Sequence, residues 1–190
     1  MIDLTPAARR TAALLAAVPD DALGARTPCG EYTLGDLVDH VGGLALAFTW
    51  AAAKDARTAL SAQGPSGDAA RLESGWQKLY PERLDALAAA WRAPDAWTGM
   101  TQAGGVDLPG EVAGLVALDE LVVHGWDIAR ATDRPYDVPQ EEIDACLEFV
   151  SQAQSGPEPG PFGAAVPVPP EAPALDRLIG LTGRDPFWTP

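Results

Sequence analysis

The sequence is poor in cysteine and in basic residues, and both shortages limit the classes of protein to which it can belong. Its two cysteines, Cys29 and Cys146, lie far apart without the spacing of a zinc ribbon or a disulfide framework, so we expect reduced thiols. Lysine and arginine number 13 against 27 acidic residues, and the formal net charge is −14 at pH 7. Because so negative a surface repels phosphate groups, we expect neither nucleic acid nor an anionic membrane as a partner.

The sequence also lacks a long hydrophobic run. No stretch approaches the roughly 18 continuous apolar residues of a membrane span, and Met1–Leu4 has no basic region of the kind that opens a signal peptide. We therefore predict a cytoplasmic protein. Its 190 residues, 47% of them hydrophobic and 21% charged, have the composition of one globular domain. We place that domain over residues 1–190, with a core of about 1–154 and a C-terminal extension of 155–190.

Apolar residues recur at three- and four-residue steps through much of the chain, a spacing that indicates helices with one buried face. The segment 109–132 has so broad an apolar surface that it should lie centrally. No internal repeat or heptad run accompanies this pattern. We predict an all-α fold, a bundle with helices over about 5–18, 34–53, 76–91, 109–132, 139–154 and 174–181.

Local signals mark the ends and the weak points of these helices. Thr5 before Pro6 fits a hydroxyl N-cap followed by proline at the first helical position. Thr33 and Asp36 have the spacing of a capping box at the start of the second helix. An interior proline costs a helix roughly 3 kcal/mol, so we expect a kink or a break at Pro81.

Three stretches lack a helical pattern. Residues 61–68 and 155–173 are dense in glycine and proline, and both should be loops, the second either ordered by packing or mobile. Residues 97–106 contain Gly104-Gly105, which fits either a small hairpin or an irregular loop. The sequence does not decide between these two.

The only two histidines lie on strongly predicted helices, beside the apolar faces. Glu120 and His124 are four residues apart, so their side chains project from one helix face and can reach the same ion. His40 can supply a third ligand if the second helix is a neighbour. Two imidazoles and one carboxylate form the set that leaves an open position on catalytic zinc, where water or substrate can bind.

Each of these residues also has a simpler interpretation. A glutamate and a histidine four residues apart usually form a solvated helix surface. Glu120, however, follows Asp119 inside an otherwise apolar run, where an uncompensated buried carboxylate would be costly. A cation would compensate it, and a hydrogen bond to His124 would do so almost as well. The residues alone leave both explanations open.

Several stretches taken together form a recognisable pattern. They are Thr27–Cys29, Tyr32–His40, Leu118–Thr132 and, in the tail, Phe162–Pro169, Ala174–Leu178 and Leu181–Pro186. This pattern resembles the DinB-like metal-binding family related to mycothiol-dependent maleylpyruvate isomerase. The resemblance covers nearly the whole chain and is most specific around the histidines.

The resemblance implies a DinB-like four-helix bundle with additional short C-terminal helices. It implies a divalent metal ion held by His40, Glu120 and His124, with zinc as the first candidate and nickel or iron as alternatives. It also implies a low-molecular-weight thiol such as mycothiol, activated at the metal. We expect the chain to lack a separate C-terminal domain of the kind that the isomerase carries, so maleylpyruvate itself is not carried over as a substrate.

Our leading hypothesis is therefore a thiol-dependent transferase or isomerase that acts on a small molecule. A competing hypothesis is a metal-binding protein without catalysis, such as a stress-response or small-molecule-binding bundle, and a third is a structural bundle without metal. Arginines that line the pocket would favour the enzyme, and Arg83 and Arg92 are available for this. The sequence leaves the oligomeric state open, a homodimer included.

Three more residues have chemistry near the predicted centre or on its helices. Asp127 follows His124 by one turn and either accepts a hydrogen bond from the imidazole or lies on the surface. Cys29 precedes His40 by about three helical turns, so we expect it to be too distant to share an ion with that histidine. Cys146 should be inert core.

Overall fold

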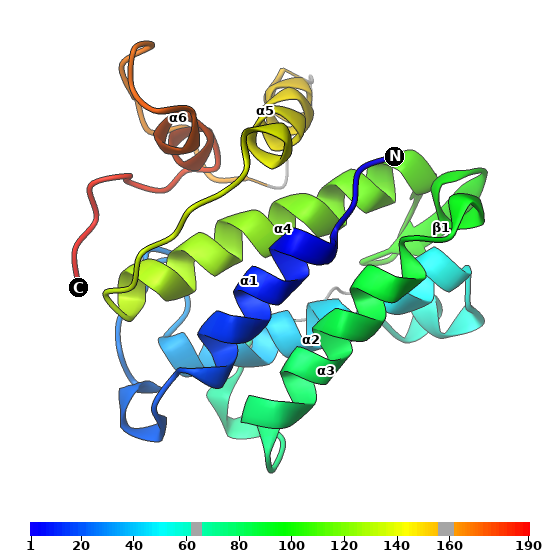
Figure 1. The fold of residues 1–190 in the computed structure, drawn as a ribbon, viewed down its shortest axis with the longest axis horizontal. Coiled ribbons are helices and arrows are strands. Elements are labelled where there is room, and N and C mark those ends of the chain that lie inside the picture. Colours follow the sequence, from blue (N-terminus) through cyan, green and yellow to red (C-terminus); the bar gives the residue numbers. More distant parts are fainter. Residues whose placement is uncertain (62–65, 156–161) are drawn as a thin grey trace.

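Four helices pack around a shared apolar core in the computed structural model, which describes residues 1–61, 66–155 and 162–190. They are α1 (Thr5–Ala16), α2 (Leu34–Ala53), α3 (Trp76–Ala90) and α4 (Gly110–Ala131). Both α1 and α2 contact α3 and α4, which gives a four-helix bundle (Figure 1). Two further helices, α5 (Gln140–Gln154) and α6 (Ala174–Leu181), pack on each other, and α5 also packs on α4. The predicted all-α class and its additional C-terminal helices are confirmed.

Helix α2 begins at the capping box that the sequence indicates. The Thr33 hydroxyl accepts a hydrogen bond from the Asp36 amide at 3.3 Å, and the Asp36 carboxylate accepts one from the Thr33 amide at 2.9 Å. These two bonds satisfy amide groups that have no partner within the helix. Gly42 then lets Tyr80 approach closely, because a side chain at this position would lie 2.5 Å from the tyrosine ring. Helices α2 and α3 can therefore pack tightly.

Helix α1 is capped differently from our expectation. Thr5 is the first helical residue instead of the N-cap, and the N-cap residue Leu4 makes no side-chain cap. The carboxylate of Asp3 accepts the hydrogen bond from the Thr5 amide at 2.9 Å. An acidic side chain suits the positive end of the helix dipole, so Asp3 takes the place that we assigned to the threonine hydroxyl.

Of the kink and the break that we considered at Pro81, the break is wrong. Helix α3 is continuous from Trp76 to Ala90, with the proline inside it. Tyr80, Leu84 and Leu87 are almost completely buried on either side of Pro81. Burial of side chains of this size stabilises the fold by about 1.5 to 3 kcal/mol each, which offsets the cost of the interior proline.

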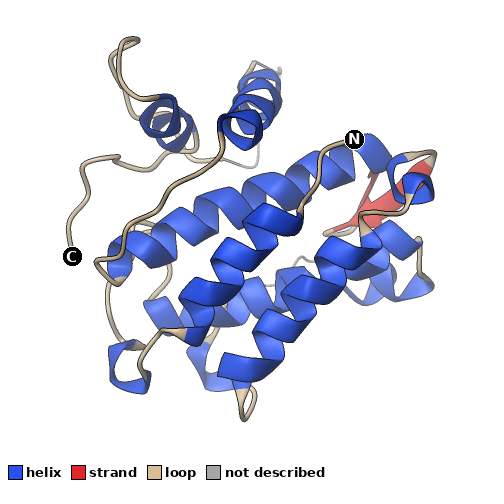
Figure 2. Cartoon of the chain, in the orientation of Figure 1, coloured by secondary structure: helices blue, strands red, loops and turns tan. Residues whose placement is uncertain are grey.

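The segment after α3 forms the hairpin, the first of our two alternatives. Strands β1 (Met100–Ala103) and β2 (Val106–Pro109) pair in antiparallel register, with Met100 opposite Pro109. Gly104 and Gly105 form the two-residue turn with φ of +57° and +78°, a backbone conformation that glycine adopts without strain. Figure 2 shows this hairpin as the small strand pair at one end of the bundle.

The remaining connections contain short 3-10 turns at Asp20–Ala22, Ala56–Ser61, Ala69–Arg71 and Pro94–Trp97. Our loop prediction for 61–68 falls partly on residues 62–65, and that for 155–173 partly on 156–161, both outside the described residues. Residues 66–68 and 162–173 are irregular, as expected.

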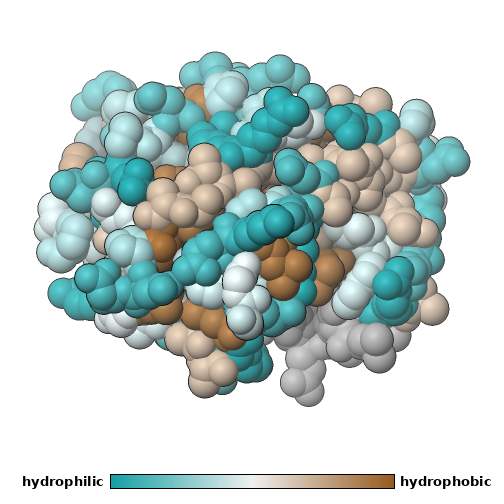
Figure 3. Space-filling view, turned by 60° about the horizontal axis from the view of Figure 1, so that its bottom comes forward, coloured by the Kyte–Doolittle hydropathy of each residue, from teal (hydrophilic) through white to brown (hydrophobic). Residues whose placement is uncertain are grey.

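The described surface mixes polar and apolar side chains. On the face drawn in Figure 3, hydrophobic residues form separate patches between hydrophilic ones. Large exposed apolar side chains include Met100, Val106 and Phe187. Among the helices of the described chain, none has the length and hydrophobicity to cross a membrane.

Candidate metal centre and its pocket

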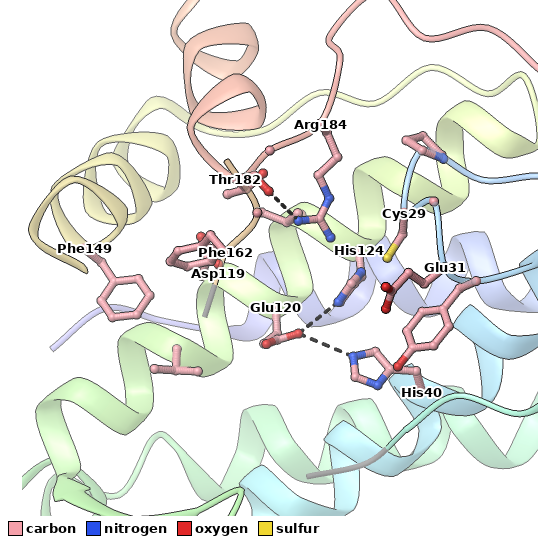
Figure 4. A pocket seen from close by; sticks show the side chains of 17 residues that line it. Cys29, Glu31, His40, Asp119, Glu120, His124, Phe149, Phe162, Thr182 and Arg184 are labelled. Carbon is pink, nitrogen blue, oxygen red and sulfur yellow. Dashed lines mark hydrogen bonds and ion pairs between the residues drawn. The ribbon is translucent and has the colours of Figure 1, made fainter. Parts of the chain in front are cut away.

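The packing of α2 against α4 brings together the three residues that the sequence singled out. His40 lies in the second turn of α2, and Glu120 and His124 lie one turn apart on α4. The His124 Nε2 atom is 3.0 Å from Glu120 Oε2, and the His40 Nε2 atom is 3.7 Å from the same oxygen (Figure 4). One ligand atom from each of the three residues lies within 4.8 Å of the other two.

This geometry fits a divalent cation. Zinc ligand atoms at 2.0 to 2.1 Å from a tetrahedral ion would be roughly 3.3 Å from one another, and the two imidazole nitrogens lie 3.0 and 3.7 Å from Glu120 Oε2. The Glu120 Oε2 atom is buried, and the imidazoles of His40 and His124 both face it. A buried carboxylate is costly unless it is compensated, and either a shared divalent cation or the two facing imidazoles can compensate Glu120.

Asp127 orients one of the imidazoles from the opposite side. It is fully buried, so the surface alternative is wrong, and its Oδ2 atom lies 3.0 Å from His124 Nδ1. Arg184, from the turn after α6, donates to both Asp127 oxygens at 3.1 and 3.4 Å. When His124 is neutral and donates Nδ1–H to Asp127, the lone pair of its Nε2 atom points toward Glu120, where a shared metal ion could accept it.

The close charges shift the protonation of the centre. Burial by itself lowers the pKa of His124, but the hydrogen bond to Asp127 and the contact with Glu120 outweigh it and raise this pKa to about 9. Burial opposes ionisation of Glu120, yet His124 and His40 hold the pKa of its carboxyl well below the usual range. Burial, and then the charge of Glu120, raise the pKa of the neighbouring Asp119 to about 8.

Cys29 lies closer to the centre than we expected. Its Sγ atom is within 4.8 Å of ligand atoms of His124 and Asp127. The turn after α1 is closed by a bridge between Arg26 and Thr33, so the chain folds back instead of running along the axis of α2. Asp127 already accepts bonds from His124 and from an arginine, so this second trio suits a cation less well than the first. Burial, and then the charge of Asp127, raise the pKa of the Cys29 thiol to about 11.

A pocket of about 530 Å³ opens over the three predicted ligands. This volume falls within the range of small-molecule sites. One wall comes from residues 28–32, another from α4, and the third from α5 and the tail. The C-terminal helices therefore complete the pocket that the four-helix bundle begins.

Comparison with known proteins identifies the relatives of this chain. Residues 4–129 match the family described as the mycothiol maleylpyruvate isomerase N-terminal domain. The chain belongs to this family. The matched region contains His40, Glu120, His124 and Asp127, whereas Arg184 lies beyond it.

Other proteins similar to this member of the mycothiol maleylpyruvate isomerase family match a larger part of the chain. An uncharacterized protein of Mycobacterium tuberculosis, found in strains H37Rv and CDC 1551, is 32% identical over 183 residues, which is 91% of each chain. The crystal structure of the mycothiol-dependent maleylpyruvate isomerase has a similar fold, with a TM-score of 0.56 at 17% identity over 78% of this chain and 69% of the enzyme. A His-to-Ala mutant of that enzyme gives a TM-score of 0.55 at 18% identity, over the same shares of the two chains.

The two arginines that we expected as pocket candidates lie elsewhere. Arg83 pairs with Glu73 at 2.6 Å and stacks over Tyr80, and Arg92 is exposed. The arginine that lines the pocket is Arg184, from a tail motif that contributed to the family resemblance but had no predicted role. Cys146 is fully buried in the core, as predicted.

Proposed function

We propose that this chain binds one divalent metal ion, with zinc as the first candidate, through His40, Glu120 and His124, and acts as a thiol-dependent transferase or isomerase. The observation that carries the proposal is the convergence of two imidazoles on the buried Glu120 Oε2 atom, which brings one ligand atom of each residue within 4.8 Å of the other two. This ligand set leaves a fourth position for an exogenous ligand.

The proposed thiol is mycothiol or a similar small thiol, because the family and the similar solved enzyme are named for mycothiol. A divalent cation would supply a lowered pKa for a thiol bound to it. In a transfer, the thiol sulfur stays on the electrophilic carbon of the substrate. In an isomerisation, it leaves again after rotation about the bond that its addition has made single.

The side chains of the protein would prepare this chemistry. Asp127 fixes the orientation of His124, and Arg184 in turn fixes Asp127 through its guanidinium. Helix α5 and the tail form one side of the pocket, which limits the access of water to the reacting groups from that side. The pocket volume of about 530 Å³ is in the range of sites that bind small molecules.

Elemental analysis tests the metal half of the proposal. Protein purified without chelator and without a nickel column should contain close to one equivalent of metal, and His124→Ala should lose most of it. Glu111→Gln, an exposed substitution on the same helix, should keep the metal of the parent protein. Equal metal content in the parent and in His124→Ala would overturn the proposed site.

Thiol consumption tests the catalytic half. The metal-loaded protein should accelerate the loss of mycothiol in the presence of an electrophilic enone, and His124→Ala should not. Stoichiometric metal without any acceleration would favour the competing function, a metal-binding protein without catalysis.

A further inference from the structure

The pocket has two ends of different chemistry. In Figure 4, Phe149 and Phe162 lie to one side of Glu120, whereas Cys29 and Glu31 lie to the other. The two phenylalanine rings meet edge to face, with 6.1 Å between their centroids. Both side chains are only partly buried and line the pocket, so part of each remains available to a ligand. We call these two residues the aromatic end.

Charges in the pocket disfavour an anionic substrate. Arg184 is the one lysine or arginine among the described residues that line it. The guanidinium of Arg184 already donates to both carboxylate oxygens of Asp127 and to the Thr182 carbonyl. Glu31 and Glu120 add negative charge to the walls. A dicarboxylate would therefore have only the proposed cation to offset its charge.

The aromatic end lies outside the family region. The match to the family ends at residue 129, whereas Phe149 is on α5 and Phe162 is in the tail. The predicted metal ligands thus come from the part that family members share, and the aromatic end comes from the part that follows it. This division separates the residues proposed for the reaction from residues that can select the substrate.

We propose that the pocket selects an electrophile with a neutral aromatic group, held against Phe149 and Phe162. Ring-to-ring contacts stabilise such a ligand beyond the area that it buries. The reaction itself rests on the proposed function: the thiol sulfur bonds to the β-carbon of an enone, the carbon–carbon π bond breaks, and the α-carbon takes up the proton that the thiol has lost. No oxidant and no leaving group are needed.

Binding of two unreactive ketones tests the preference without any thiol. The compounds 4-phenylbutan-2-one and 4-oxopentanoate are both methyl ketones. The first ends in a phenyl ring, and the second ends in a carboxylate. By titration calorimetry on the full chain, the phenyl ketone should bind at least about tenfold more tightly. Phe149→Ala should weaken the phenyl ketone about tenfold and leave 4-oxopentanoate unchanged. Phe187→Ala, a substitution of an exposed phenylalanine outside the pocket, should change neither.

Two further variants keep the test valid if Phe149→Ala does not fold. Phe149→Leu and Phe162→Leu retain apolar bulk but remove a ring, and each should weaken the phenyl ketone about threefold. Tighter binding of 4-oxopentanoate than of the phenyl ketone, or the same loss in Phe187→Ala as in the pocket variants, would overturn the inference.

Addition of mycothiol to the two corresponding enones distinguishes a failure of this inference from a failure of the proposed function. If the phenyl ketone binds through Phe149 but mycothiol is not added to 4-phenylbut-3-en-2-one, the proposed function fails and the binding preference stands. If mycothiol addition is catalysed and 4-oxopent-2-enoate is the better substrate, the proposed function stands and the preference for an aromatic group is wrong.

Discussion

Asp127 connects the candidate centre to the tail, and its role can be tested at the scale of one residue. Asp127→Asn keeps the shape of the side chain and removes its charge, so His124 would lose its charged hydrogen-bond partner. We expect metal affinity to fall about 10- to 100-fold, because partners that orient a ligating histidine typically contribute that much. Competition with a chromophoric chelator measures the change.

Asp133→Asn is the matched control for this variant. Asp133 is exposed just after α4, at a left-handed backbone position with φ of +51° that asparagine also tolerates. Its metal affinity should equal that of the parent protein. An Asp127→Asn affinity within twofold of the parent would show that the buried aspartate does not support a metal ligand.

The residues of the site differed in how well the sequence could predict them. Glu120 and His124 share a helix, so their four-residue spacing was enough to place both side chains on one face. Cys29 and Arg184 could not be placed in this way. The position of Cys29 depends on a turn that folds back between Arg26 and Thr33. The position of Arg184 depends on how the tail returns to α4. Neither arrangement leaves a periodic signal.

At the scale of the element, the capping box of α2 has an effect that can be measured. Thr33→Ala removes the hydroxyl that accepts a hydrogen bond from the Asp36 amide, which should destabilise the protein by about 1 kcal/mol. Thr5→Ala is the control, because no side chain caps α1 through that hydroxyl. Chemical denaturation of both variants should show the larger loss in Thr33→Ala, and equal losses would contradict the importance of the box.

The helices themselves were largely predictable, because hydrophobic periodicity reports which face is buried. Helix α2 begins and ends where the pattern indicated, and the short helix α6 does as well. The wrong cap at Thr5 and the wrong alternative of a break at Pro81 have different causes. The cap of α1 came from a neighbouring carboxylate, and the interior proline of α3 is tolerated because packing against α1 and α2 outweighs a local preference.

At the scale of the whole molecule, we propose that residues 1–190 form one domain. Cys146 of α5, Val150 of α5 and Leu178 of α6 belong to the same buried cluster as the bundle helices. Calorimetry should therefore record one cooperative unfolding transition for the full chain. Two resolved transitions would show that α5 and α6 unfold separately from the four-helix bundle.

The pH dependence of stability connects the folded molecule to the proposed metal. In the metal-free protein the pKa of His124 is raised from 6.5 to about 9, so its stabilising effect is complete below about pH 6.5 and is lost as the pH rises through 9. The pKa of Asp119 is raised from 3.8 to about 8, and its effect is also lost as the pH rises through that value. Metal-free protein should therefore melt at a lower temperature at pH 9 than at pH 6.5.

Zinc should reverse this trend. Coordination requires the unprotonated imidazole, so zinc must displace a proton from His124 below about pH 9, and it should bind more tightly as the pH rises toward that value. Because a ligand that binds only the folded state raises its stability, the difference in melting temperature between zinc-loaded and chelator-treated protein should widen from pH 6.5 to 9. Asp119→Asn should reduce the change of melting temperature with pH in the metal-free protein. The difference in melting temperature between zinc-loaded and chelator-treated protein should remain. A difference that stays constant over this range would mean that zinc does not displace the His124 proton, which is incompatible with coordination by this residue.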